Sequence, residues 1–209
     1  MSVRSQAVAE TRRRIVDAAI ALHAHQGALR TSWDEIAAEA GLARATVYQH
    51  FPSLAQLIPA CAQVAFDLAE VPTREAARAR FARMRSPRQR LTYFVEESCR
   101  CYAASAKWLR AAWRERDLVP PMRTAVDRLQ AALGVLLDAA LDEIRLDDDV
   151  RRTLRVLLDF PFWDALVTAG VPKEQVAARI LRLAESEIGF HRRSQPWTRR
   201  KTSGSSTPS

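Results

Sequence analysis

The chain has 209 residues, of which 48% are hydrophobic and only six are glycine; this composition excludes a disordered chain and suits a globular protein with a sizeable core. Alanine, leucine and arginine are abundant, and polar and apolar residues show no sustained alternation, which excludes an extensive β-sheet and predicts an all-α fold. The formal net charge of +8 does not by itself indicate a nucleic-acid ligand, because residues 1–60 carry six arginines against five acidic residues.

The first predicted helix runs from about Glu10 to His25 and ends before Gly27. Its apolar residues recur at helical spacing and form one inward stripe. The stripe consists of Ile15, Ala18, Ala19 and Leu22. Ser32 and, three residues later, Glu35 form a capping-box pattern, which predicts the start of a second helix.

Gly41 predicts the end of the second helix, because glycine readily adopts the left-handed conformation of a tight turn. Residues 44–50 then predict a short third helix. Leu42, Val47 and Phe51 are the apolar positions that we expect to pack between these helices. The arrangement predicts a helix-turn-helix whose second helix, residues 44–50, reads DNA.

Several runs of residues in this region form a more specific pattern. They are Glu35-Ile36-Ala37, Ala40-Gly41-Leu42 and Thr46-Val47-Tyr48-Gln49-His50-Phe51, preceded by Thr11-Arg12, Ile15, Ala18-Ala19, Leu22 and Gly27. In order and spacing they resemble the DNA-binding domain of the TetR family of bacterial transcriptional regulators. The resemblance implies a homodimer that binds double-stranded DNA, with a helical C-terminal domain for a small-molecule effector. It covers residues 10 to 60 closely and the remainder only in length and helical content.

We predict DNA contacts from the recognition helix and the residues that flank it. These are Thr11, Arg12, Ser32, Arg44, Ala45, Thr46, Tyr48, Gln49 and His50. Arg44 is long enough to bind a guanine edge in the major groove, the alternatives being a phosphate contact or a solvated side chain. Tyr48 and His50 match positions that in the family hold backbone phosphates. His50 could instead satisfy the last carbonyl groups of its own helix.

The chain departs from the family's pattern at two positions. Ala43 stands where the family often has a serine or threonine that caps the recognition helix. The missing hydroxyl group costs about 1 kcal/mol of helix stability. Leu54 stands where a lysine often begins the fourth helix, which removes a phosphate contact. Ser53 remains as an N-cap whose neighbouring amides suit a phosphate.

The fourth predicted helix, from about Ser53 to Glu70, has an apolar face broad enough to contact two cores. Val71-Pro72-Thr73 interrupts the helical pattern, since the residue before a proline avoids helical geometry. We therefore expect an N-terminal helix-turn-helix domain at 1–52, a linking helix at 53–72, a helical effector-binding and dimerisation domain at 73–193 and a disordered tail at 194–209.

The second half of the chain predicts further helices. Residues 73–85 form an arginine-rich helix, whose face either is solvated or attracts acidic ligands, and Ser86-Pro87 opens another that carries Tyr102. A short segment with two tryptophans follows, and a long apolar helix begins after Pro120-Pro121. The last two helices span residues 148–169, capped by Asp147 and kinked at Pro161, and 172–192. By resemblance, these two pair with a second copy in a four-helix interface.

Aromatic residues are concentrated in this second region. They are Phe94, Tyr102, Trp108, Trp113, Phe160, Phe162 and Trp163. The resemblance implies an effector pocket in this domain, and apolar pockets are commonly lined by aromatic side chains, so we predict that these residues form the pocket of a small apolar or aromatic effector. Plain core packing is the alternative for each of them.

No pattern indicates an enzyme, a metal site or a cofactor. The four histidines lack metal-binding spacing, and neither a nucleophile elbow nor a phosphate-binding loop occurs. The three cysteines do not form a zinc pattern or a disulfide framework. With no apolar stretch of roughly 18 residues and no signal peptide, we expect a cytoplasmic protein without a membrane partner.

The sequence thus predicts a DNA-binding transcriptional regulator, most simply a repressor that a small effector releases from a palindromic operator. The alternative is a DNA-binding dimer without a small-molecule ligand, whose second domain serves only dimerisation or binds a protein partner.

Overall fold

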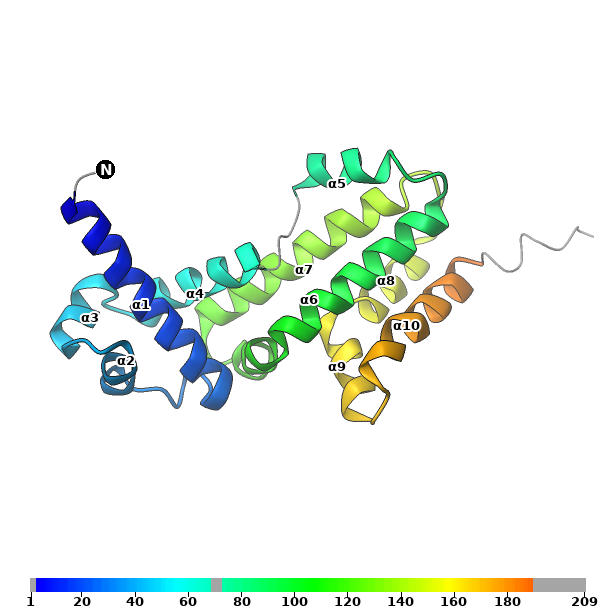
Figure 1. Ribbon diagram of the computed structural model, residues 1–209. Helices are drawn as coiled ribbons and strands as arrows, with labels where there is room; N and C mark the ends of the chain where they lie inside the picture. Colours follow the sequence, from blue (N-terminus) through cyan, green and yellow to red (C-terminus); the bar gives the residue numbers. More distant parts are fainter. Residues whose placement is uncertain (1–2, 69–72, 190–209) are drawn as a thin grey trace, which may run out of the picture.

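The computed structural model describes residues 3–68 and 73–189, and within these ranges the chain forms ten α-helices and no strand (Figure 1). The all-α prediction is therefore confirmed. The helices are α1 (Val3–Gln26), α2 (Trp33–Ala40), α3 (Arg44–His50), α4 (Leu54–Leu68), α5 (Arg74–Phe81), α6 (Pro87–Glu115), α7 (Pro120–Ala140), α8 (Asp148–Leu157), α9 (Phe160–Thr168) and α10 (Lys173–Ile188). None of the described helices is both long enough and apolar enough to span a membrane.

Local signals explain the helix-turn-helix. The hydroxyl group of Ser32 accepts a hydrogen bond from the Glu35 amide at 3.2 Å, and the Glu35 carboxylate accepts one from the Ser32 amide at 2.7 Å, so the predicted capping box is confirmed. Gly41 ends α2 with a φ of 63°, in the left-handed region. The short turn then sets α3 against α2 and presents one face of α3 to solvent.

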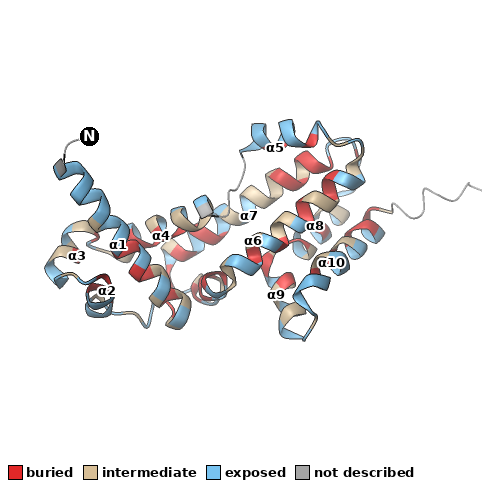
Figure 2. Ribbon diagram, viewed as in Figure 1, coloured by how far each residue is buried: buried red, intermediate tan, exposed pale blue. Residues whose placement is uncertain are grey.

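Two apolar cores lie along the molecule, and α4 contributes to both. Leu57 and Cys61 are fully buried in the core of α1 to α4, which also contains Ile36 and Phe51. Ile58 and Ala62, on the neighbouring face of α4, belong to the larger core that α5 to α10 complete. Figure 2 shows α4 lying between α1 and α7, and it contacts both helices. The predicted two-sided packing of this helix is confirmed.

One long helix, α6, replaces two predicted segments. We expected a helix through Tyr102 and then a short separate segment with Trp108 and Trp113, but α6 runs without a break from Pro87 to Glu115. Residues 102–115 contain neither glycine nor proline, and the buried positions continue at helical spacing. The arginine-rich helix is shorter than predicted, since α5 ends at Phe81. The serine cap before Pro87 forms as predicted, with the Ser86 hydroxyl accepting from the Gln89 amide.

The predicted helix over residues 148–169 is in fact two helices, and this prediction was wrong. Helix α8 ends at Leu157, and Asp159 caps α9 by accepting a hydrogen bond from the Phe160 amide at 2.8 Å. Pro161 lies in the first turn of α9, where its missing N–H group costs nothing, so the proline starts a new helix rather than kinking a continuous one. Asp147 forms no side-chain cap on α8.

The ends of the chain also differ from the predicted bounds. Helix α1 begins at Val3 rather than near Glu10, and α10 ends at Ile188, where Gly189 takes a φ of 77°. The predicted tail at 194–209 and the end of the linking helix at 69–72 lie outside the described residues.

A buried carboxylate connects the end of α6 with the loop after α1. Glu115, at the end of α6, is 4% exposed and accepts hydrogen bonds from the amides of Ala28 at 2.7 Å and Leu29 at 3.3 Å, in the loop after α1. Gly27 makes this approach possible, since a Cβ atom there would lie 1.8 Å from a Glu115 carboxylate oxygen. Any displacement of the end of α6 therefore acts directly on the loop between α1 and α2.

His23, on α1, lies near Glu115, and its burial predicts that the stability of the protein depends on pH. It is fully buried, and neither ring nitrogen has a hydrogen-bond partner among the described residues. Burial lowers the pKa of His23 to about 4, and the Glu115 carboxylate opposes part of this shift. Between that value and the ordinary pKa of 6.5, the unfolded chain binds a proton that the folded chain does not. The contribution of neutral His23 to the free energy of unfolding is therefore fully present above pH 6.5 and is lost as the pH falls toward 4.

We expect the free energy of unfolding to decrease by about 3 kcal/mol over this pH range because of His23. Urea denaturation at a series of pH values measures it. The substitution His23→Leu should flatten the curve between pH 6.5 and 4. His25, exposed on the same helix, is the matched control, and a curve changed equally by His25→Leu contradicts the assignment.

Candidate DNA-binding surface and ligand cavity

Helix α3 is held by buried apolar residues and presents polar side chains to solvent. Val47 and Phe51 are 0% exposed and pack into the N-terminal core. Among the residues predicted to contact DNA, Arg44, Ala45 and Gln49 are exposed, whereas Thr46, Tyr48 and His50 are half-buried. The geometry holds α3 rigidly while leaving its outer face open, as insertion into a major groove requires.

Arg44 is held in place by neighbouring side chains. Its guanidinium donates to the Asp34 carboxylate at 2.9 Å and to the Tyr48 hydroxyl group at 3.4 Å. The hydrogen bond to Tyr48, and then the charge of Asp34, raise the pKa of Arg44. Trp33 packs against Tyr48 with ring centroids 5.1 Å apart. Reading a base would exchange the exposed ion pair with Asp34 for a contact with DNA, at little cost.

Arginines on α1 bind the ends of the neighbouring helices. Arg12 donates to the backbone carbonyl of His50 at 3.0 Å and lies 4.2 Å from the centre of the Phe51 ring. Arg14 donates to the carbonyls of Ala40 at 2.5 Å and Gly41 at 3.1 Å. Both cations satisfy carbonyl groups at helix C-termini, where the helix dipole favours positive charge.

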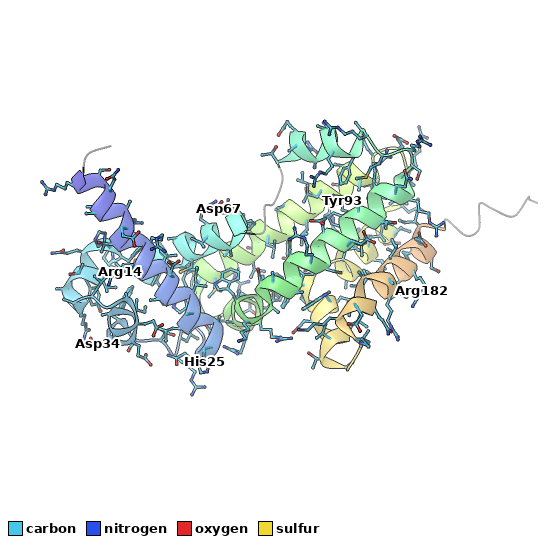
Figure 3. All side chains as sticks on the ribbon, viewed as in Figure 1. Arg14, His25, Asp34, Asp67, Tyr93 and Arg182 are labelled. Carbon is cyan, nitrogen blue, oxygen red and sulfur yellow. The ribbon has the colours of Figure 1, made fainter. Side chains whose placement is uncertain are left out.

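The structure places the other predicted contacts as follows. The Thr11 hydroxyl group donates to the carbonyl of Ala7 at 2.9 Å, and the Ser32 hydroxyl group is engaged in the capping box. Figure 3 shows Arg14 and Asp34 together at the end of the molecule far from Tyr93. Trp33, Asp34 and Arg14 are not among the residues predicted from the sequence. An aromatic and an acid at the start of α2 are visible in the sequence, but nothing in it shows that they face α3.

Ala43 leaves the recognition helix without a side-chain cap, although its backbone has the extended geometry of an N-cap residue, with φ −71° and ψ 142°. We expect Ala43→Ser to stabilise the protein by about 1 kcal/mol, because the hydroxyl group can accept a hydrogen bond from the first turn of α3. Thermal unfolding measures the gain. Ala45→Ser, inside the same helix, is the control and should be neutral or slightly destabilising; stabilisation by both would contradict a capping effect.

The larger core contains a cavity of about 360 Å³ between α4, α5, α6 and α7. Phe94, Tyr102, Trp108 and Trp113, four of the aromatics that we assigned to a pocket, line it. Phe66, Phe81 and Tyr93, which we did not assign, line it as well. Its size lies within the range of roughly 300–1,000 Å³ that is typical of small-molecule sites.

The other three assigned aromatics do not line this cavity. Phe160 and Trp163 are 1% exposed and pack behind it, with the Phe160 ring 5.2 Å from Trp113 and 5.7 Å from Tyr102. Phe162 is half-buried against the same core. The chain changes direction at the break between the end of α8 and the start of α9, so the rings of Phe160 and Trp163 point into the core rather than toward the cavity. Helix α9 therefore packs behind the cavity wall. The Tyr102 hydroxyl group donates to the carbonyl of Leu158 at 2.8 Å and fixes the wall to that break.

The described residues contain no cluster of side chains suited to a metal ion. Burial raises the pKa of the Cys61 and Cys99 thiols to about 12, so both stay protonated and unreactive.

Comparisons with known proteins agree with this geometry. Residues 15–61 match the family described as bacterial regulatory proteins, tetR family. No curated protein matches the chain. A structure described as that of a transcriptional regulator from Saccharomonospora viridis in complex with choline is 25% identical, over 85% of this chain and 96% of that chain, with a TM-score of 0.60.

Two further solved structures share the fold at lower identity. One is described as a TetR-family transcriptional regulator from Rhodococcus sp., 19% identical over 86% of this chain and 99% of that chain, with a TM-score of 0.66. The other is the multidrug binding protein EbrR complexed with imidazole, 21% identical over 82% of this chain and 93% of that chain, with a TM-score of 0.55.

Proposed function

The chain belongs to the TetR family of bacterial transcriptional regulators, and from this premise we propose that it is a homodimeric repressor that an effector releases from a palindromic operator. The observation that carries the proposal is the pairing of an exposed recognition helix with a separate aromatic cavity in one chain. Such a protein acts where the DNA is, in the cytoplasm.

Operator recognition would use the outer face of α3. Arg44 and Gln49 are exposed and long enough to reach base edges, while Tyr48 and His50 lie where they can bind phosphate groups. The near balance of charge in residues 1–60 leaves few phosphate contacts, so the affinity should fall only modestly with salt.

Dimerisation would use the outward faces of α8 and α10. The inward apolar residues of these helices, such as Leu154 and Ile180, are already buried within the chain. Val156 on α8 and Leu183 on α10 are large apolar side chains that are 66% and 45% exposed. A second copy that covers them would form a four-helix interface.

Release from DNA would pass through α6. The cavity-lining residues Trp108 and Trp113 lie within two turns of Glu115, whose carboxylate holds the loop after α1. Helix α4 offers a second route, since it packs in both cores. A ligand that favours a different position of α6 would thereby favour a different separation of the two recognition helices. The structures in complex with choline and with imidazole support the proposal that this chain, too, binds a small organic molecule.

Selection from a pool of random duplexes by the purified protein tests the proposal. We expect enrichment of inverted half-sites whose centres are about 34 Å apart, one turn of DNA. Recovery of a single unpaired half-site would contradict the dimer, and no enrichment would contradict operator recognition. If selection succeeds but no small molecule changes operator binding, the alternative of a dimer without a small-molecule ligand would replace the effector-released repressor.

A further inference from the structure

The charged residues of the cavity favour an anion. Three charged side chains line the cavity, namely Arg80 of α5 and Glu97 and Arg100 of α6. Arg100 donates to the Glu97 carboxylate at 2.8 Å, so the one acidic group of the three is already paired. Arg80 donates to the Tyr93 hydroxyl group and, among the described residues, forms no ion pair with a carboxylate. The lining therefore retains a positive charge.

Two of the aromatic rings that line the cavity already have an arginine over their faces. The Arg80 guanidinium lies 5.2 Å from the centre of the Tyr93 ring, and the Arg128 guanidinium lies 4.5 Å from that of Phe66. Both rings line the cavity. A cationic ligand that bound either ring would have to displace its arginine, and the positive charge of Arg80 would repel a cation elsewhere in the cavity.

The surroundings of Arg80 extend the positive potential. Residues 74–85 contain five arginines and one acidic residue, and Arg78 and Arg83 are exposed on either side of Arg80. Exposed charges of one sign close to an apolar cavity raise the local concentration of ligands of opposite charge.

We propose that the effector is an amphipathic organic acid, whose carboxylate binds Arg80 and whose apolar body lies among Phe94, Trp108 and Trp113. The proposal rests on the effector site of the proposed function and specifies its ligand class. The planar guanidinium binds a carboxylate through two parallel hydrogen bonds, and the exposed position of Arg80 keeps the charged group near water while the apolar body is buried.

Matched ligands test the charge of the head group. The probes are 4-phenylbutyrate, 4-phenylbutanol and 4-phenylbutylammonium, together with decanoate, decanol and decylammonium, with dissociation constants from titration calorimetry of the full chain. In at least one series, we expect the carboxylate to bind about tenfold more tightly than the alcohol and the ammonium ion to bind most weakly. The substitution Arg80→Gln should bring the carboxylate to within about twofold of the alcohol. Arg78→Gln, on the same helix but outside the lining, is the matched control: it removes an equal charge from the surroundings and should leave most of the carboxylate preference in place.

Three results would overturn the ligand class: tighter binding of the ammonium ions, a carboxylate preference that survives Arg80→Gln, or no binding of any probe. Operator affinity of the same preparations, with and without each probe, separates these failures from failure of the proposed function. Intact DNA binding with no bound probe refutes the ligand class alone. Tight carboxylate binding that leaves operator affinity unchanged supports the ligand class and refutes effector-driven release.

Discussion

The substitution Gly27→Ala should lower the free energy of unfolding by about 3 kcal/mol, because it strains the backbone and displaces a buried carboxylate. Gly27 has a φ of +91°, and its new Cβ atom would lie 1.8 Å from a Glu115 oxygen. Glu115 would then lose its hydrogen bonds to the amides of Ala28 and Leu29 and remain buried without them. Urea denaturation, analysed by the midpoint and slope, measures the loss.

Gly170→Ala is the matched control. Gly170 has a φ of +87°, but no atom lies within 4 Å of the position of its Cβ atom, so the backbone strain is the same and the steric conflict is absent. We expect a loss of about 1 kcal/mol there. Equal losses at the two glycines would show that the contact between Glu115 and the loop after α1 contributes nothing to stability. They would also contradict the proposal that α6 acts on the DNA-binding helices through this contact.

The substitution Arg44→Ala should weaken binding to the selected operator about 10- to 100-fold, corresponding to about 1 to 3 kcal/mol for a contact with a base edge. Binding to an unrelated duplex should change much less, because Arg44 is expected to read bases rather than to supply general charge. The protein should remain folded, since the pair with Asp34 is exposed and contributes little to stability. Fluorescence anisotropy on both duplexes measures the two affinities.

Arg145→Ala removes the same charge from an exposed loop between α7 and α8 and serves as the control. It should leave both affinities nearly unchanged. If Arg44→Ala weakens operator and unrelated DNA by the same factor, Arg44 contacts phosphate rather than a base. If it weakens neither, the outer face of α3 is not the reading surface.

The parts of the fold that local chemistry determines were predictable from the sequence. Ser32 with Glu35, Gly41, and Ser86 before Pro87 are caps whose partners lie within a few residues, and each forms as expected. The two-sided packing of α4 follows from its apolar spacing alone. The break after Leu157 was missed because a proline is compatible with both a kinked helix and a new first turn, and the packing of Phe160 and Trp163 decides between them.

Contacts between distant residues were not predictable in this way. Glu115 and Ala28 are 87 positions apart, and nothing local indicates that this carboxylate, among many, is buried. Likewise, Arg12 matches a DNA-binding position of the family, yet it binds the carbonyl of His50, 38 positions away. The aromatic composition indicated a cavity, but only the packing of α9 shows which rings face it.

The most direct test of sequence-specific DNA recognition is the binding of the purified full chain to a duplex from upstream of its own coding sequence, compared with a shuffled duplex of the same composition. Fluorescence anisotropy at about physiological salt is the measurement. A sequence-specific regulator that controls its own promoter binds the native duplex at least about 1,000-fold more tightly than the shuffled one. Equally weak binding to both, together with no enriched sequence from random duplexes, would contradict the claim that this chain reads DNA.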